Sequence, residues 1–264
     1  MTDALRLAFG TLTVLPVRPP RTVDRRTAGR AMVLAPVVAL VLSLLCVALL
    51  AATAHGPSLL RAALCVALLA LLTRGMHLDG LADTSDGLGS GKPPDEALAV
   101  LRRGDVGPFG VVTLALVLLV QVAALDGLIA RDVAMGALPV ALLVSRAALP
   151  LLCSRGVPAA RPDGLGNAVA GSVTRAGLLG AAVLLMICLA VVAVGYRELA
   201  GAELAAGQPW SNGVAVLVAA TLGGASAVLL AARCVRRLGG VTGDVLGAAV
   251  EVSFTVCLVV LALA

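Results

Sequence analysis

The feature that most constrains this chain is a series of apolar stretches, each about 20 residues long, separated by short polar segments. A helix of about that length, rising 1.5 Å per residue, crosses the ~30 Å hydrocarbon core of a bilayer. Six stretches contain at most one charge, and a seventh contains Arg61 near one end. The stretches are Ala31–Ala54, Pro57–Met76, Gly107–Leu125, Val133–Ser154, Ala176–Tyr196, Ser211–Ala232 and Val245–Ala264.

Lipid determines which secondary structure these stretches can form. Only 13% of the 264 residues are charged, about half the share in a soluble domain of about 25%. Sheet edges are excluded from hydrocarbon, and the alternation typical of a β-barrel is absent from the sequence. We therefore predict an all-α, polytopic membrane protein with about seven transmembrane helices, forming one domain over residues 1–264. Residues 1–30 form a cytoplasmic or interfacial segment in which Leu5–Leu15 is a short helix.

The distribution of basic residues predicts the orientation. With seven spans, 16 of the 20 Lys and Arg residues fall in loops on one side, three on the other, and Arg146 within a span. Positive charge stays on the cytoplasmic side, so the N-terminus is predicted to be cytoplasmic. The same reasoning accounts for the net charge of +5 without nucleic-acid binding. All the polar motifs described below fall on that side, in the inner membrane of a bacterium.

The strongest polar motif lies in a segment, residues 77–108, that we predict to be a cytoplasmic active-site loop. It begins His77-Leu-Asp79-Gly-Leu-Ala-Asp83-Thr-Ser-Asp86. On a helix, aspartates at i, i+4 and i+7 form one stripe with neighbours about 5–6 Å apart. No Lys or Arg lies between Arg74 and Lys92 to neutralise them, and Mg²⁺ prefers a few carboxylates plus phosphate oxygens. The spacing favours a metal site, and a solvated acidic loop is the alternative.

Basic and acidic residues follow in the same segment. Pro93–Arg103 is predicted to be a short helix with acids in its first turn and bases in its last. It leads to Asp105 in a glycine-rich turn. Arginine beside aspartate and glycine is typical of phosphate recognition, which makes Arg102 and Arg103 candidate ligands of a substrate anion. Arginines that only flank a span are the alternative.

Two charges lie within predicted spans. Arg146 and Glu251 each stand well inside an apolar stretch, where a charge costs about 2.5–3.5 kcal/mol even on the lenient insertion scale. Two explanations stay open, an ion pair between them and a polar pocket that both line below the cytoplasmic surface.

Two glycine-containing motifs adjoin the later spans. They are Gly164-Leu-Gly166-Asn167 and the segment from Leu238 to Gly247. Glycine lets the backbone approach a ligand or a neighbouring helix closely. Asp244 is predicted to be the N-cap of the last helix, and capping alone would explain it.

The motifs together resemble those of the cobalamin (5′-phosphate) synthase family, the adenosylcobinamide-GDP ribazoletransferases. Gly75-Met-His77-Leu-Asp79-Gly-Leu-Ala-Asp83-Thr-Ser-Asp86-Gly87 and Leu238-Gly-Gly-Val-Thr-Gly-Asp244-Val-Leu-Gly247-Ala-Ala-Val-Glu251 carry the resemblance most specifically. Weaker matches lie at Phe9–Val17, Ser145-Arg146 and Gly164–Asn167, so the resemblance covers nearly the whole chain. The family order of acid and base is reversed at Arg103 and Asp105, and we predict that the two side chains pair with each other or within one shared network.

The resemblance implies a Mg²⁺-dependent phosphotransferase in the membrane. Its substrates would be adenosylcobinamide-GDP and α-ribazole or its 5′-phosphate, and its products GMP and adenosylcobalamin or its 5′-phosphate. The implied metal ligands are Asp79, Asp83 and Asp86, and either Asp86 or Asp244 is the candidate base. The candidate substrate-binding residues are His77, Arg102, Arg103, Asp105, Arg146, Asn167 and Glu251. A homo-oligomer stays open.

Two other classes are weighed against this interpretation. A CDP-alcohol phosphotransferase also carries spaced aspartates, but it requires an arginine where this chain has Asp83. A transporter would place polar groups deep in paired, broken helices, whereas most polar groups here gather at one predicted surface.

Overall fold

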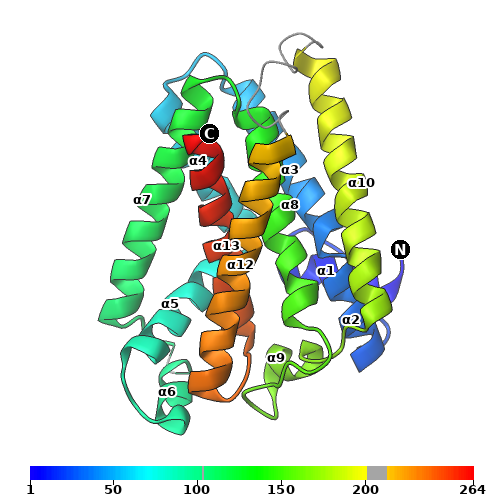
Figure 1. The fold of residues 1–264 in the computed structure, drawn as a ribbon, viewed down its shortest axis with the longest axis vertical. Coiled ribbons are helices and arrows are strands. Elements are labelled where there is room, and N and C mark those ends of the chain that lie inside the picture. The colour runs from blue at the N-terminus through cyan, green and yellow to red at the C-terminus, as the bar shows by residue number, and fades with distance from the viewer. Residues whose placement is uncertain (103, 201–212) are drawn as a thin grey trace.

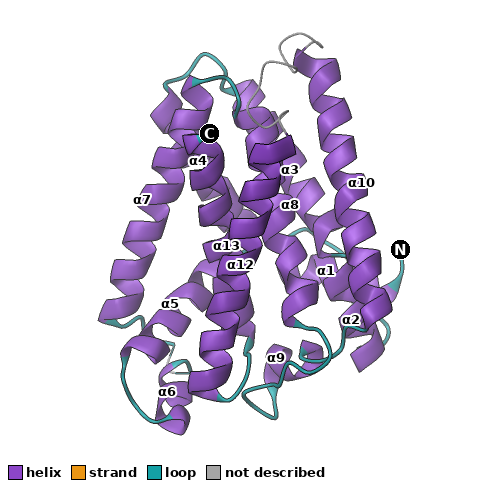
Figure 2. Ribbon diagram, in the orientation of Figure 1, coloured by secondary structure: helices purple, strands orange, loops and turns teal. Residues whose placement is uncertain are grey.

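The computed structural model describes residues 1–102, 104–200 and 213–264. These residues form twelve α-helices joined by loops, and the described part of the chain contains no β-strand (Figure 2). The helices are α1 (Asp3–Leu12), α2 (Arg25–Val33), α3 (Ala35–Ala52), α4 (Ser58–Leu72), α5 (Met76–Gly89), α6 (Pro94–Val100), α7 (Pro108–Ala130), α8 (Ala134–Leu152), α9 (Gly164–Val169), α10 (Arg175–Ala200), α12 (Gly213–Leu238) and α13 (Gly243–Leu263).

The helices confirm the polytopic class. Among the described residues, six helices are long and apolar enough to cross a membrane, namely α3, α7, α8, α10, α12 and α13. A seventh span exists if α4 and α5, which meet at an angle of 87°, are counted as one broken helix. The predicted interfacial helix also exists as α1, with Thr2 at its N-cap.

Burial separates central helices from peripheral ones. About 83% of the α8 span and 67% of the α13 span are buried, against 11% for α10 and 17% for α7. The two central helices stand inside the bundle in Figure 1. Peripheral helices expose large apolar side chains such as Leu179 and Leu229, which suits a lipid-facing surface.

The second predicted span is shorter than expected. We expected a helix over Pro57–Met76, but α4 ends at Leu72 after 15 residues. Arg74 and Gly75 both adopt positive φ, 57° and 65°, and the Gly75 amide donates to the Ala70 carbonyl over 2.7 Å. This six-residue closure is a Schellman-type helix stop. The chain therefore turns sharply, and α5 starts in a new direction.

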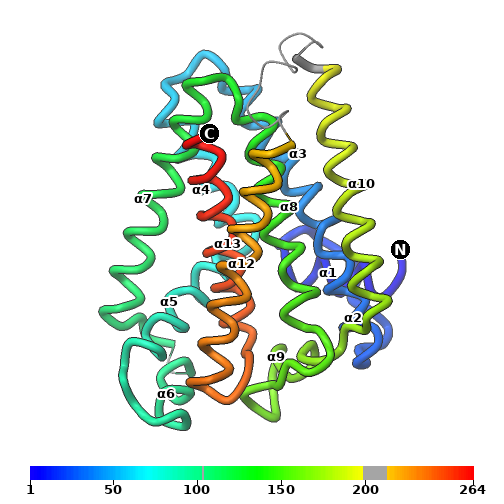
Figure 3. The backbone as a smooth tube through the Cα atoms, viewed as in Figure 1, coloured from blue at the N-terminus to red at the C-terminus, as the bar shows by residue number. Residues whose placement is uncertain are grey.

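The short helices gather at one end of the bundle. Figure 1 places α5, α6, α9 and α2 there, and the trace in Figure 3 shows the C-terminus near the opposite end. Helices α5 and α6 occupy much of the segment 77–108, and α6 confirms the short helix predicted over Pro93–Arg103. The connection from α8 to α9 is fixed by backbone hydrogen bonds, including Ala160 N–H to the Val241 carbonyl at 3.0 Å.

Candidate active site

A cavity of about 410 Å³ opens among the short helices and the ends of α8 and α13. Five of the residues expected to be functional border it, namely His77, Asp79, Arg102, Asn167 and Asp244. They come from segments as far apart in sequence as α5 and α13. The fold therefore brings several separate motifs to one place.

The aspartates of α5 reach Asp244 because α5 and α13 nearly touch at Gly80. A Cβ atom at Gly80 would lie 2.6 Å from the Asp244 carbonyl oxygen, so only glycine permits this approach. Asp79 and Asp244 both border the cavity, and Asp83 interacts electrostatically with each of them. Three carboxylates from two helices thus share one polar region.

Asp86 also acts electrostatically on Asp83, but its side chain has hydrogen-bond partners of its own. Its two carboxylate oxygens accept hydrogen bonds from the backbone N–H groups of Gly107 (2.8 Å) and Gly110 (3.0 Å), at the start of α7. The side chain is buried, and a carboxylate at a helix N-terminus is stabilised by the free amides and the helix dipole. A shared metal-binding role for the three carboxylates of α5 therefore stays a prediction, while both oxygens of Asp86 are already hydrogen-bonded. In the described part of the chain, no three His, Cys, Asp or Glu side chains are arranged around a metal position.

The predicted cap of the last helix is also corrected. Thr242, not Asp244, is the N-cap of α13, and its hydroxyl accepts a hydrogen bond from the Val245 amide over 3.2 Å. The Thr242 hydroxyl lies 3.1 Å from an Asp244 oxygen and can donate to it. Asp244 is therefore free of the capping role and is half-buried at the cavity.

Arg161 also borders the cavity, although the sequence marks it only as one of the 16 basic residues on the predicted cytoplasmic side. One Nη2–H group donates to the Leu98 carbonyl at 2.8 Å, while the buried Nε has no partner among the described residues. Burial lowers the pKa of Arg161, and the nearby Asp244 and Asp83 carboxylates partly offset that effect. Its position three residues before Gly164 in the glycine motif was the available signal.

Arg102 forms the rim of the cavity with Asp163. Its Nη2 lies 3.1 Å from one Asp163 oxygen, and both side chains are largely exposed. An exposed pair of this kind contributes about 0–1 kcal/mol, so a substrate anion can replace Asp163 at small cost. Asn167 is exposed and donates to the Pro162 carbonyl over 2.7 Å.

Of the two residues with reversed charges, Arg103 and Asp105, the structure describes Asp105. Arg103 lies outside the described residues, and the exposed Asp105 is not among the residues that border the cavity. Their mutual pairing therefore stays a prediction.

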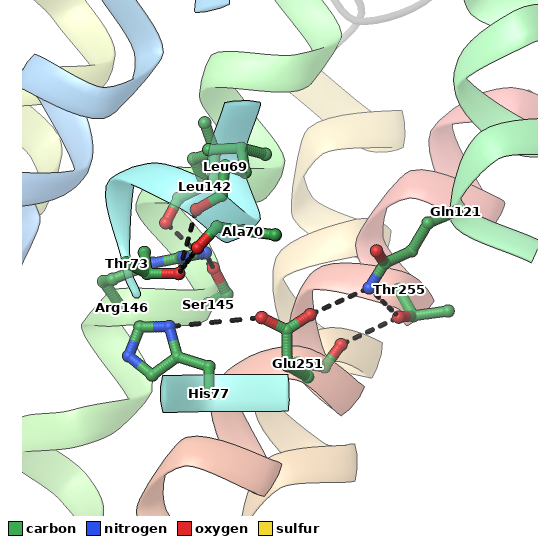
Figure 4. Close-up of polar contacts among 10 residues, drawn as sticks. All are labelled: Leu69, Ala70, Thr73, His77, Gln121, Leu142, Ser145, Arg146, Glu251 and Thr255. Carbon is green, nitrogen blue, oxygen red and sulfur yellow. Dashed lines mark hydrogen bonds and ion pairs between the residues drawn. The ribbon is translucent and has the colours of Figure 1, made fainter. Parts of the chain in front are cut away.

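The two charges within spans, Arg146 and Glu251, belong to a buried polar cluster (Figure 4). Glu251 accepts a hydrogen bond from Gln121 at 2.9 Å, and a Glu251 oxygen lies 4.0 Å from His77 Nδ1. Arg146 donates to Ser145 over 2.9 Å and lies over the Phe254 ring. Among the described residues Arg146 and Glu251 are not within ion-pair distance, although each charge acts electrostatically on the other.

The second explanation describes the cluster better. Arg146 and Glu251 border one small cavity of about 10 Å³ together with Gln121 and Thr73. The space is about that of one water molecule, which polar groups of this kind can hold. His77 links this cluster to the larger cavity, because it borders the larger cavity while its imidazole lies toward Glu251 (Figure 4).

Carboxylates and arginines around one cavity are the groups that phosphoryl-transfer enzymes use, and here they stand at the end of a membrane-length bundle. The fold and the cavity thus define a multi-pass membrane enzyme. The family model described as cobalamin-5-phosphate synthase matches residues 4–262. The chain belongs to the cobalamin-5-phosphate synthase family, which acts in the assembly of vitamin B12.

Curated relatives agree with the family match. An adenosylcobinamide-GDP ribazoletransferase of Nocardioides sp. is 44% identical over 260 residues, covering 98% of this chain and 97% of the relative. Proteins of the same name from Frankia casuarinae and Pseudomonas fluorescens are 40% and 37% identical over similar spans. No solved structure matches the chain. These relatives favour the first interpretation over a CDP-alcohol phosphotransferase or a transporter.

Proposed function

We propose that the cavity catalyses the adenosylcobinamide-GDP ribazoletransferase reaction on the cytoplasmic face of the bacterial inner membrane. The observation that carries the proposal is that Asp79 and Asp244, from two motifs of the family resemblance, border one cavity with Arg102 and Arg161. The relatives' name supplies the substrates, adenosylcobinamide-GDP and α-ribazole.

The bond changes define what the residues must do. A ribose hydroxyl of α-ribazole attacks the phosphorus attached to the corrinoid, and the bond from that phosphorus to the bridging oxygen breaks to release GMP. The alternative acceptor keeps its 5′-phosphate in the product, so the attacking oxygen is not the 5′ oxygen. The hydroxyl proton passes to a carboxylate.

Asp244 is the better of the two candidate bases. It borders the cavity and is half-buried, whereas both oxygens of Asp86 are already hydrogen-bonded to the start of α7. Arg161 and Arg102 bind the diphosphate oxygens, which are anionic and match the planar donors of guanidinium groups. Both arginines border the cavity, and Arg161 lies close enough to Asp244 and Asp83 to interact with their carboxylates.

The carboxylates fit a magnesium ion. Mg²⁺ needs only one or two protein carboxylates when substrate phosphates supply other ligands. Asp79 and Asp83, with Asp244 beside them, provide that number, and Arg161 is a neighbouring cation that acts on Asp83. When bound, Mg²⁺ would neutralise charge that develops on the leaving GMP.

The test is a direct assay. Membranes containing the protein, given adenosylcobinamide-GDP, α-ribazole and Mg²⁺, should form adenosylcobalamin and GMP in equal amounts. EDTA should stop the reaction, and added Mg²⁺ should restore it. Membranes without the protein are the control, and equal product from both preparations would refute the activity.

A further inference from the structure

We infer that the apolar floor of the cavity, made by Leu12, Met32, Met76 and Leu149, binds the aromatic base of the nucleoside acceptor. This inference rests on the proposed reaction and assigns a place to one of its two substrates. The floor is defined by four side chains from α1, α2, α5 and α8, all of which border the cavity.

The side chains that border the cavity are of two chemical kinds. Asp79, Asp244, Arg102 and Arg161 carry its charge. The floor is apolar and well packed, since Leu12, Met32 and Leu149 expose 5%, 2% and 2% of their surface. A ligand bound here therefore needs a charged or strongly polar end and an apolar end.

Size decides which part of the substrates can enter. A cavity of about 410 Å³ lies near the lower end of the range of about 300–1,000 Å³ for ligand pockets. It can enclose one nucleoside, but a corrin ring with its attached nucleotide is far larger. The corrin ring therefore stays outside the cavity, while the charged residues at the cavity hold its diphosphate.

Polarity decides between the two nucleosides. Guanine carries an amide and an amino group, and each polar group left unpaired on burial costs about 1–3 kcal/mol. Among the uncharged polar residues at the cavity, Asn167 already donates to the Pro162 carbonyl and the Thr242 hydroxyl is hydrogen-bonded to Asp244 and Val245. Thr11 and His77 also border the cavity, but the His77 imidazole is directed at Glu251 (Figure 4). The dimethylbenzimidazole base of α-ribazole carries methyl groups and no N–H donors, so the floor suits it better.

The methionines of the floor are suited to an aromatic ring. Met32 and Met76 are two of the five methionines in the chain and come from different helices. Methionine sulfur in contact with an aromatic ring contributes about 0.3–1.5 kcal/mol. Two thioethers from two helices can contact one planar base.

The floor is held rigidly by the same turn that directs α5. Arg74 Nη2 donates to the carbonyls of Gly10 (3.0 Å) and Thr13 (3.3 Å), next to Leu12. The Val14 amide also donates to the Leu72 carbonyl over 2.8 Å. Helix α1 is therefore fixed to the junction of α4 and α5, so base and carboxylates keep a constant relative position.

The experiment measures KM separately for the two substrates. Met32→Ala and Leu149→Ala should each raise KM for α-ribazole about 10-fold or more, with KM for adenosylcobinamide-GDP within twofold of the parent. Met32→Leu, which keeps the apolar volume, should restore most of the affinity. Met186→Ala and Leu151→Ala are the matched controls, because these side chains are 66% and 47% exposed, away from the cavity.

Three outcomes are distinguishable. A larger rise in KM for adenosylcobinamide-GDP would overturn the inference and place guanosine on the floor. A change no larger than in the controls would also overturn it. Because a cavity-forming variant can fail to fold, equilibrium binding of α-ribazole to Met32→Leu and Met32→Ala, at matched thermal stability, provides a second measurement. If the parent protein forms no adenosylcobalamin, the proposed function fails instead.

Discussion

At the scale of single residues, the aspartates of α5 have divided roles. Asp79 is exposed at the cavity and Asp83 is half-buried beside Asp244, while Asp86 holds the first turn of α7. Their regular spacing in sequence predicted one shared role. The spacing identifies the face of a helix, but it does not show that another helix begins beside its last carboxylate.

The first prediction separates these roles by substitution. Asp79→Asn should nearly abolish turnover at limiting Mg²⁺ without lowering thermal stability, because the exposed side chain supports no other contact among the hydrogen bonds described above. Asp86→Asn should instead destabilise the protein by about 1.5–3 kcal/mol, since it weakens hydrogen bonds to a buried charge. Turnover assays and thermal unfolding in the same detergent measure the activity and the stability of each variant. Equal loss of turnover with unchanged stability in both variants would contradict the division.

The second residue-scale prediction concerns Arg161. Arg161→Gln should lower kcat/KM for adenosylcobinamide-GDP by about 100-fold, as loss of a donor that stabilises transition-state charge commonly does. Arg161→Lys should recover part of the loss, because the charge returns without the planar donor pair. KM for α-ribazole should change little in either variant. Arg155→Gln is the control, since Arg155 belongs to the same loop but does not border the cavity; the same loss there would sink the assignment.

At the scale of elements, the crossing of α5 and α13 builds the site. Close backbone contact at Gly80 places residues more than 160 positions apart within one cavity, and the turn at Arg74 and Gly75 sets the direction of α5. The sequence predicted the helices from their apolar lengths. It could not predict this turn's angle, because positive φ at Arg74 depends on its hydrogen bonds to Gly10 and Thr13.

The third prediction tests that crossing. Gly80→Ala should displace α5 from α13 and reduce both turnover and thermal stability, since the added Cβ meets backbone that cannot move alone. Gly127→Ala in α7 is the matched control. No atom lies within 4 Å of a Cβ at Gly127, and alanine there should stabilise the helix by about 0.5–1 kcal/mol. Parent-like activity in Gly80→Ala would show that the close approach is not needed.

At the scale of the whole molecule, the sequence predicted class and span positions well, because lipid imposes the length and polarity of each span. Six described spans match predicted stretches to within several residues. The cavity was predicted less completely. Its charged residues were largely named, but Arg161 and the floor were not, because the apolar side chains of a cavity look like those of any packed core.

The fourth prediction concerns orientation, which the charge distribution alone supports. An impermeant thiol reagent added to intact cells should label a cysteine placed at Ser58 and miss one placed at Ser90, with both labelled after lysis. The six native cysteines are all buried, so the parent chain is a low-background control. Labelling of the Ser90 position in intact cells would place the cavity on the outer side.

The contact between Asp86 and the start of α7 also bears on the order of assembly. Helix α5 leaves the ribosome before Gly107 and Gly110, so its buried carboxylate lacks those partners until the next span is made. Asp244 arrives still later, on the final helix. Chains are synthesised from the N-terminus at about 5–20 residues per second. The hydrogen-bond partners of Asp86 in α5 therefore come with α7, and the carboxylate of Asp244 that completes the site comes with α13. The catalytic centre is thus among the last parts of the molecule to be completed.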